Sequence, residues 1–188
     1  MQHSSLIEKY ILSLRTIQAD KKAPVLDLAC GKGRNGLYLV ENDIKVNFAD
    51  VNDESLEQVE QSLSKIGKSK GKQKLAQCWQ VDFEQANSTS LKGKSFSAIM
   101  VFRYLHRPLF EQIKTAIKPG GMIIYETFTE QQAQFGRPKN PDFLLKPKEL
   151  IELFADWQIL HSFEGTVNAS QNSNTKQAIA QIVAVKPN

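Results

Sequence analysis

The chain has 188 residues, 41% of them hydrophobic and 23% charged, which is the length and composition of one soluble globular domain spanning residues 1–188. No run approaches the ~18 consecutive apolar residues of a membrane helix, and Met1–Ser5 lacks the basic start and apolar block of a signal peptide. Cys30 and Cys78 are too few for a disulfide framework. These features exclude a membrane protein and a disulfide-stapled secreted domain, and they predict a cytoplasmic protein.

The net charge of +4 originates in one ten-residue segment, 65–74. Five lysines lie there, and the 19 other basic residues of the chain face 20 acidic ones. The excess positive charge therefore belongs to one predicted connector and not to a face of the domain. We interpret this segment as a solvated loop, with phosphate binding as the alternative. The lysines are Lys65, Lys68, Lys70, Lys72 and Lys74.

In chain order, the first predicted element is a helix over residues 5–17, because Ser5 and Glu8 have capping-box spacing and apolar residues follow at helical spacing. An apolar run at 25–29 then predicts a strand, which leads through a glycine turn into a helix that ends before Asn42. The further predicted elements are a strand at 44–49, a helix at 53–66, a strand at 75–81, a polar stretch at 84–95, a strand at 96–102, a helix at 108–117, a strand at 122–128, a loop at 129–145, a helix at 147–155, and strands at 157–163 and 179–185.

This order of elements predicts an α/β fold. Strands that alternate with helices form a parallel sheet that is covered on both faces. No helical pattern separates the last two strands, so we expect them to pair antiparallel at the edge of the sheet. The prediction is a doubly wound, mostly parallel, seven-stranded sheet with an antiparallel C-terminal strand pair, preceded by an N-terminal helix within residues 1–20.

The segment from Asp27 to Gly33 predicts a ligand site. A strand ends there, the backbone turns tightly and a helix begins, and Gly31 and Gly33 let the main chain approach a ligand with no Cβ in the way. Asp50 ends the second strand, where open α/β sheets place an acid that accepts hydrogen bonds from a ribose. Asp82 ends the third strand. Three carboxylates that end adjacent parallel strands would line one crevice.

The same glycines allow a second interpretation. Gly31, Gly33 and Gly36 also have the spacing of a dinucleotide-binding fingerprint, and Asp50 lies near the acid expected there. An acid just before the turn does not help a pyrophosphate, however, and Asp27 suits a cationic or hydroxylated ligand. The antiparallel tail is also foreign to the dehydrogenase pattern, so a nicotinamide dehydrogenase is disfavoured.

The segment from Asp27 to Gly33 resembles the first motif of class I S-adenosylmethionine-dependent methyltransferases, with Ala29 where many members have glycine. The resemblance covers about residues 20–188. Within that superfamily, the segment 30–39 is similar to the tellurite-resistance methyltransferases. Later motifs match in order at Asp50, Asp82, Phe102 and 118–121.

The resemblance implies S-adenosyl-L-methionine as the cofactor. It places Asp27 against the methionine moiety, Asp50 on the ribose and Asp82 on the adenine amino group. From the residues alone, Asp27 could instead cap the turn, Asp50 could cap the next helix, and Cys30 could be a small buried filler. Ala29 and Gly31 are expected to bind through their main chain, and Val51 and Phe83 to lie on the two sides of the adenine. The other expected cofactor-binding residues are Asp27, Cys30, Gly33, Asn35, Asp50, Asp82 and Phe102.

The acceptor side is marked by the cluster after the fourth strand. Methyl transfer from a sulfonium mainly requires a positioned nucleophile, so the chemistry proceeds without an obvious base. We interpret Arg103, Tyr104 and His106 as catalytic residues that position the acceptor, with His106 as the candidate base. Alternatively, His106 caps the following helix and Tyr104 packs in the core. The long loop 129–145 is a candidate substrate loop, with Arg137 facing an anion.

The sequence thus predicts an enzyme that methylates a small molecule or a soft inorganic nucleophile. Glu126 is expected either to pair with one of these arginines or to act as a catalyst. The chain lacks an appended nucleic-acid module and the Asn-Pro-Pro-aromatic tetrad of many nucleic-acid amino-group methylases, so nucleic acid is disfavoured. RNA or protein methylation through the lysine segment and a catalytically silent cofactor-binding protein are the alternatives. We expect no metal, no membrane partner, and a monomer or homodimer.

Overall fold

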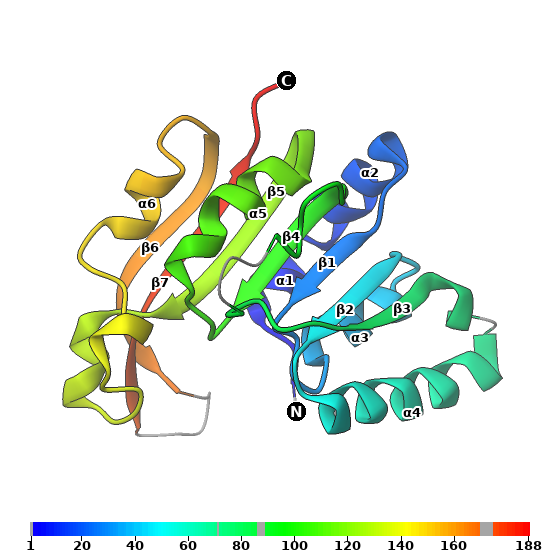
Figure 1. The fold of residues 1–188 in the computed structure, drawn as a ribbon, viewed down its shortest axis with the longest axis horizontal. Helices are drawn as coiled ribbons and strands as arrows, with labels where there is room; N and C mark the ends of the chain where they lie inside the picture. Colours follow the sequence, from blue (N-terminus) through cyan, green and yellow to red (C-terminus); the bar gives the residue numbers. More distant parts are fainter. Residues whose placement is uncertain (1, 71, 86–88, 170–174) are drawn as a thin grey trace.

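A computed structural model describes residues 2–70, 72–85, 89–169 and 175–188. The described strands are β1 (Val25–Leu28), β2 (Val46–Asp50), β3 (Ala76–Gln80), β4 (Phe96–Phe102), β5 (Ile117–Phe128), β6 (Gln158–Asn168) and β7 (Lys176–Val185). They form one seven-stranded sheet in the order β3-β2-β1-β4-β5-β7-β6 (Figure 1). Strands β1 to β5 are parallel, and β7 pairs antiparallel with β5 and β6. The predicted fold class is confirmed.

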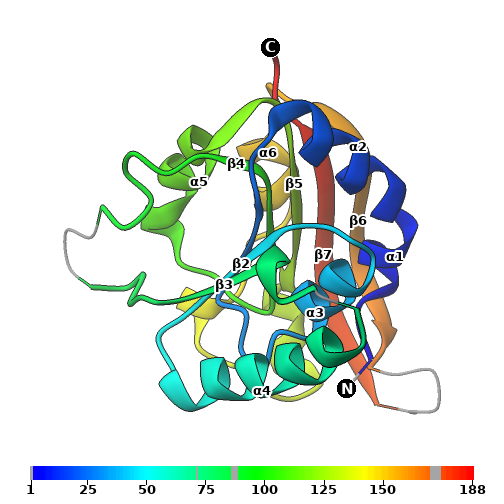
Figure 2. The ribbon, with the colours of Figure 1, turned by 90° about the vertical axis from the view of Figure 1, so that its right-hand side faces the viewer.

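Helices cover both faces of this sheet. The described α-helices are α1 (Ser5–Lys9), α2 (Ile11–Lys21), α3 (Arg34–Glu41), α4 (Asp53–Lys70), α5 (Phe110–Ala116) and α6 (Glu149–Leu153). Figure 2 shows α5 on one side of the sheet and the pair α1 and α2 on the other. Each face of the sheet carries its own hydrophobic core, and alternate residues of β4 point into one or the other. Ala98 and Met100 pack with α1 to α4, whereas Ile99 and Val101 pack with α5 and α6. Among the described helices, none is both long enough and apolar enough to cross a bilayer.

The predicted N-terminal helix over 5–17 is in fact two helices. The chain leaves helical geometry at Tyr10, and α2 continues from Ile11 to Lys21. The N-cap of α1 is Ser4, one residue before the predicted capping box, and its hydroxyl accepts a hydrogen bond from the Leu6 N–H at 3.2 Å. Leu6 in α1 and Leu14 in α2 are both buried, so apolar contacts attach each helix to the sheet separately.

Strand β5 begins at Ile117, earlier than the predicted residue 122, and includes the Pro-Gly-Gly run at 119–121. A Cβ on Gly121 would lie 2.6 Å from the Ser97 carbonyl oxygen. Glycine therefore permits the close approach of β5 to β4, and it does so beside the register shift between Phe96 and Ala98.

The lysine segment is not the loop that the sequence predicted. Helix α4 runs to Lys70, so Lys65, Lys68 and Lys70 belong to its last turns. The side chains of residues 67–73 lie outside the described part of the chain. The helix extends beyond its predicted end because lysine is a good helix former, and this propensity outweighs the pattern of charge and glycine.

Candidate active site

The turn after β1 is built on left-handed backbone. Ala29, Gly31 and Gly33 have φ values of 52°, 52° and 70°. The Cys30 N–H donates to the Ala49 carbonyl at 3.0 Å and so fixes the turn to β2. A Cβ added to Gly31 would have no heavy atom within 4 Å, so it would project into open space. The backbone at Gly31 is therefore bare on the side from which a ligand can approach.

Asp27 lies behind this turn and is only 3% exposed. Its Oδ2 accepts a hydrogen bond from the Gly36 N–H at 3.0 Å. Burial raises the pKa of Asp27 to about 8, opposed by the Gly36 hydrogen bond and the charge of Arg34, and the Asp50 carboxylate adds to the rise. The binding of a positive charge beside Asp27 would therefore drive off its proton.

Asp50 and Asp82 lie at the carboxyl ends of β2 and β3, at the same edge of the sheet. Asp50 Oδ2 accepts a hydrogen bond from the Gly31 N–H at 2.7 Å, and Asp82 Oδ1 accepts one from the Glu84 N–H at 2.8 Å. The pKa of Tyr104 is raised by burial first, then by Glu84, with Asp82 and Asp50 adding to the rise. Both aspartates therefore act electrostatically on Tyr104, and Asp50 also stabilises the glycine turn through its hydrogen bond with Gly31.

The two residues expected beside an adenine differ in their surroundings. Val51 is 59% exposed immediately after β2, so its side chain is free to cover a flat ring. Phe83 is buried and packs edge-on against Trp79, with ring centroids 5.7 Å apart. Phe83 is thus held rigidly by the core, whereas Val51 offers an apolar surface to solvent.

A cavity of about 860 Å³, here called the motif cavity, opens beside the glycine turn. Of the expected cofactor residues, it is lined by Asp27, Ala29, Cys30, Gly31, Asn35 and Phe102. The other five lie outside its lining, namely Gly33, Asp50, Val51, Asp82 and Phe83. Gly33 has a packing role, since a Cβ there would lie 2.7 Å from the Val59 side chain. The size of the cavity is in the range that holds a small organic ligand.

A second cavity of about 780 Å³, here called the neighbouring cavity, adjoins the first. Residues 2–5 and Glu8 line it from the N-terminus, Arg103 lines it directly after β4, and Glu126 lines it from β5. Residues of β6 and β7, together with Ala169, line it from the other side. The two cavities have four lining residues in common, which are Arg34, Arg103, Ala169 and Gln177.

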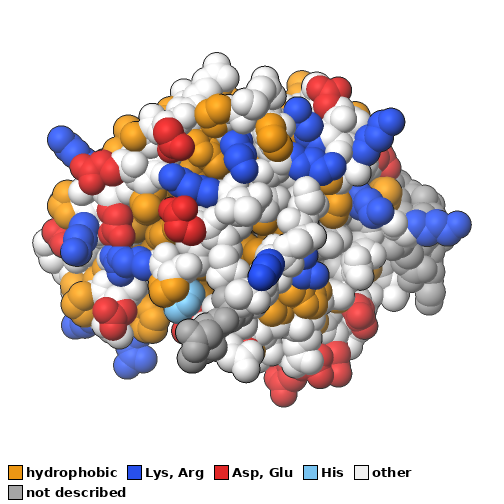
Figure 3. Space-filling view, turned by 45° about the horizontal axis from the view of Figure 1, so that its top comes forward, with side chains coloured by type: hydrophobic (Ala, Val, Ile, Leu, Met, Phe, Trp, Pro, Cys, Tyr) orange, Lys and Arg blue, Asp and Glu red, His pale blue; other side chains and the backbone are white. Residues whose placement is uncertain are grey.

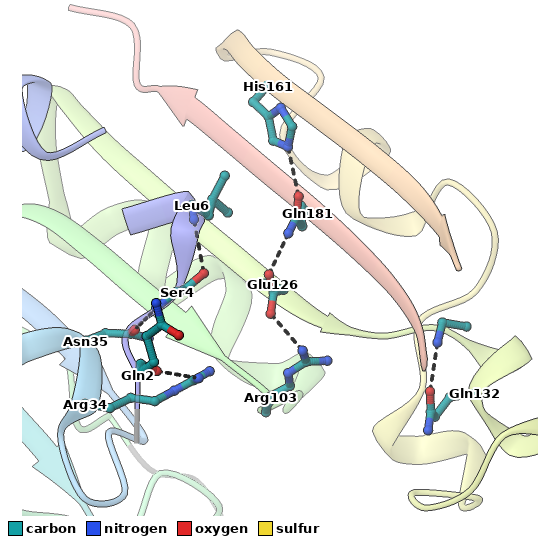
Figure 4. A network of polar contacts seen from close by, with 11 residues as sticks. Gln2, Ser4, Leu6, Arg34, Asn35, Arg103, Glu126, Gln132, His161 and Gln181 are labelled. Carbon is teal, nitrogen blue, oxygen red and sulfur yellow. Dashed lines mark hydrogen bonds and ion pairs between the residues drawn. The ribbon is translucent and has the colours of Figure 1, made fainter. Parts of the chain in front are cut away.

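Arg103 is held by a polar network that crosses the sheet (Figure 4). Its Nη2 lies 3.1 Å from Glu126 Oε1, and its guanidinium packs 4.5 Å from the Phe128 ring centroid. Glu126 Oε2 accepts a hydrogen bond from Gln181 Nε2 at 2.6 Å, and Gln181 Oε1 lies 3.0 Å from His161 Nε2. Both oxygens of the buried Glu126 are thus engaged, so the expected pairing of Glu126 with an arginine is present.

One end of the Arg103 guanidinium has no such engagement. Its Nη1 is shielded from solvent and has no hydrogen-bond partner among the described residues. Burial lowers the pKa of Arg103, Glu126 opposes this, and Arg34 adds to the fall. A shielded, unsatisfied donor between two cavities is a favourable place for an acceptor atom of a ligand.

Tyr104 and His106 do not line either of these cavities. Tyr104 packs against the core that contains Tyr125, whose hydroxyl donates to the Tyr104 carbonyl at 2.9 Å. His106 is the N-cap residue of the 3₁₀ turn η2 (Arg107–Leu109), although its side chain makes no capping hydrogen bond. Of the three residues predicted to position an acceptor, only Arg103 lines the two cavities.

The loop 129–145 contains the 3₁₀ turns η3 (Glu130–Gln134) and η4 (Pro141–Phe143) and is tied to the body of the domain. Arg107 bonds both carboxylate oxygens of Glu149, at 2.6 and 2.8 Å, and donates to the Leu144 carbonyl at 2.8 Å. The loop lines a third cavity of about 470 Å³, and Arg137 is absent from the lining of all three described cavities.

Several residues that line the two cavities come from distant segments and match no pattern in the sequence. Arg34 follows the motif directly but matches no expected role. Gln181 lies in the strand that the apolar pattern predicts at 179–185, and Gln177 precedes that predicted strand. For residues 2–5, the sequence predicts only the absence of a signal peptide and a helix that begins at Ser5. No local spacing marks these positions, because only the tertiary fold brings them together.

A mostly parallel sheet of this strand order, a glycine turn after β1 and acids after β2 and β3 define the fold of class I methyltransferases. The chain belongs to the family described as "Tellurite resistance protein TehB", whose sequence profile matches residues 5–180. A comparison with curated proteins found no match.

Solved structures share this fold. TehB from Haemophilus influenzae is 24% identical with a TM-score of 0.67, and the match covers 91% of this chain but only 61% of that one, so this chain is matched to about three fifths of that relative's length. The glycopeptide N-methyltransferase MtfA, complexed with S-adenosyl-L-homocysteine, is 14% identical with a TM-score of 0.67, covering 100% of this chain and 91% of that one. The [4+2]-cyclase SpnF is 16% identical with a TM-score of 0.62, covering 88% and 74%. These likenesses show the fold alone.

Proposed function

We propose that this chain transfers a methyl group from S-adenosyl-L-methionine, bound in the motif cavity, to an acceptor in the neighbouring cavity. One observation carries the proposal, namely that Arg34 and Arg103 line both cavities. Methyl transfer requires a donor and an acceptor held in contact, and adjoining cavities with a common wall provide that geometry. Membership of the TehB family and the S-adenosyl-L-homocysteine complex of MtfA support this choice of donor.

The residues of the motif cavity suit this cofactor. When bound, S-adenosyl-L-methionine supplies an electrophilic methyl group on a sulfonium that is already a good leaving group. The bare backbone at Gly31 leaves room for the ligand, and Asp27 supplies a carboxylate that ionises as positive charge binds. We therefore assign Asp27 and the main chain of Ala29 and Gly31 to the methionine moiety.

The remaining assignments follow the edge of the sheet. Asp50 would hold the ribose hydroxyls and Asp82 the adenine amino group, with Val51 and Phe83 on the two sides of the ring. Burial raises the pKa of the Cys30 thiol, which favours a packing role over a reactive one. The other wall-forming residues in this assignment are Cys30, Gly33, Asn35 and Phe102.

On the acceptor side, we assign Arg103 to positioning the acceptor through its unpaired Nη1. Glu126 holds Arg103 in place, since both of its oxygens are already engaged. Well-oriented reactants reach effective molarities of ~10⁵–10⁸ M, so orientation alone supplies much of the acceleration. Tyr104, whose pKa is raised by burial and Glu84 first and then by Asp82 and Asp50, fits the cofactor side. His106 precedes the turn η2 without a side-chain capping bond, and we assign it no role.

The acceptor we favour is a small molecule or a soft inorganic nucleophile, methylated in the cytoplasm by a monomer or homodimer. A volume of about 780 Å³ suits a small ligand. On the face drawn in Figure 3, basic and acidic side chains are interspersed, which is unlike the continuous basic surface typical of nucleic-acid binding. RNA or protein methylation remains the alternative, and its binding would weaken steeply with salt.

The test is an acceptor screen with the purified chain, reading out S-adenosyl-L-homocysteine. We expect turnover with at least one small acceptor and loss of that turnover in Asp27→Asn. Product from RNA or protein alone, with a steep salt dependence, would replace this proposal by the alternative. Tight cofactor binding without product from any acceptor would instead indicate a silent binding protein.

A further inference from the structure

The N-terminal arm, defined here as residues 2–8, forms one wall of the neighbouring cavity. Gln2, His3, Ser4, Ser5 and Glu8 are five of the fourteen residues that line this cavity. The arm is fixed to the domain core because Leu6 and Ile7 are buried. The acceptor space is therefore bounded by a segment that is distant in sequence from every methyltransferase motif.

The arm is seated on α3, the helix that begins at the glycine turn. The Ser4 N–H donates to Asn35 Oδ1 at 2.9 Å, and Arg34 Nη1 donates to the Gln2 carbonyl at 3.2 Å (Figure 4). The His3 ring stacks on the Tyr38 ring, with centroids 3.6 Å apart and planes 10° from parallel. These contacts fix the position of the His3 ring as well as the path of the backbone.

His3 carries a polar atom that these contacts leave unsatisfied. Its Nε2 is shielded from solvent and has no hydrogen-bond partner among the described residues. Nε2 lies 3.6 Å from Glu8 Oε2, which allows an ion pair when the imidazole is protonated but is beyond hydrogen-bond distance. A buried polar atom is normally satisfied, so an unsatisfied one in a cavity wall points to a ligand that completes it.

We propose that the arm closes the acceptor cavity and that His3 contacts the acceptor through Nε2, which sets the affinity for the acceptor. This inference rests on the proposed function, since it takes the neighbouring cavity as the acceptor site. His3 and Arg103 then offer polar atoms from different walls of one cavity, and the stack on Tyr38 holds the imidazole ready before the acceptor arrives.

The experiment measures acceptor KM, kcat and S-adenosyl-L-homocysteine affinity for three variants, using the acceptor found in the screen. His3→Phe keeps an aromatic ring on Tyr38 and removes the nitrogen. His3→Gln returns an amide nitrogen near the position of Nε2. Tyr10→Phe is the matched control, because it removes one polar atom from an aromatic ring next to the arm, where the hydroxyl bonds the Leu160 carbonyl outside the cavity.

We expect His3→Phe to raise the acceptor KM about tenfold, which is the effect of one lost hydrogen bond. Its kcat and cofactor affinity should stay within twofold of wild type, His3→Gln should recover part of the loss, and Tyr10→Phe should behave as wild type. An unchanged acceptor KM in His3→Phe, or an equal rise of the acceptor KM in Tyr10→Phe, would overturn the role of His3 but leave the proposed function standing. A wild-type chain without turnover on any acceptor would overturn the proposed function as well, so the two failures are distinguishable.

Discussion

The motif cavity and the neighbouring cavity are built in different ways. In the first, five of the seven residues from Asp27 to Gly33 line the wall, and hydrogen bonds to the adjacent strand fix the turn. In the second, the wall is assembled from the N-terminal arm, the ends of β4 and β5, and the β6–β7 hairpin. A cavity that takes five of its fifteen lining residues from one contiguous turn leaves a recognisable pattern in the sequence. A site made from distant segments does not, which is why the cofactor was easier to predict than the acceptor.

If the two cavities bind different ligands, a substitution in one should spare the binding function of the other. The variants below test this separation, beginning with the largest expected effect.

Glu126→Gln should lower turnover about 100-fold, which corresponds to about 3 kcal/mol of transition-state free energy. The variant keeps the shape of the side chain but removes the charge that holds the Arg103 guanidinium in the neighbouring cavity. Steady-state kinetics and calorimetry with S-adenosyl-L-homocysteine measure the two effects. Cofactor affinity should stay within threefold of wild type, and an equal loss of affinity and turnover would contradict the separation.

Cofactor affinity should increase about tenfold per pH unit from pH 6 toward pH 8. Asp27 has a folded-state pKa of about 8, above its ordinary value of 3.8, so the free energy of unfolding falls as pH rises from 3.8 to about 8. A positive ligand favours the ionised carboxylate, so its binding lowers this pKa and strengthens as pH rises toward 8. Arg34 and Asp50 are the charged groups that act on it. Calorimetry at several pH values measures the slope, which should be absent in Asp27→Asn. A wild-type affinity that does not vary with pH would refute the role of Asp27.

Gly31→Ala should weaken cofactor binding several-fold beyond any loss of stability. Its Cβ projects into open space in the motif cavity, and the positive φ costs about 1 kcal/mol for alanine. Gly93→Ala is the matched control, since Gly93 also has a positive φ and nothing within 4 Å of an added Cβ, but it lies outside the lining of both cavities. Thermal unfolding should shift similarly in the two variants. Equal cofactor affinities would show that the space beside Gly31 is not used.

Arg107→Ala should have the smallest effect on function. It removes the ion pair with Glu149 and frees the loop 129–145, which costs about 1 kcal/mol of unfolding free energy for a partly exposed pair. Denaturant unfolding measures this loss. Turnover and cofactor affinity should remain within twofold, because the loop lines a separate cavity. A large fall in turnover would instead support the original prediction that the loop 129–145 contacts the substrate.

The strand order, the glycine turn and the placement of Asp27, Asp50 and Asp82 at one edge could be predicted from the sequence, because each depends on local pattern and on the geometry of parallel strands. The break at Tyr10 and the early start of β5 could not, since tertiary packing decides where those elements end. His106 and Arg137 have suitable side-chain chemistry, but neither lines any of the three described cavities, and no local spacing reveals this. His3 likewise matches no pattern in the sequence, because only the tertiary fold brings it into the wall of the neighbouring cavity.

The central claim is that the turn after β1, together with Asp27, binds an adenosyl cofactor. Its most direct test is calorimetric titration of the wild-type chain and Asp27→Asn with S-adenosyl-L-methionine. We predict saturable binding of one ligand per chain for the wild type and at least tenfold weaker binding for the variant, with both proteins folded. No binding heat for the wild type with either this compound or S-adenosyl-L-homocysteine would contradict the account.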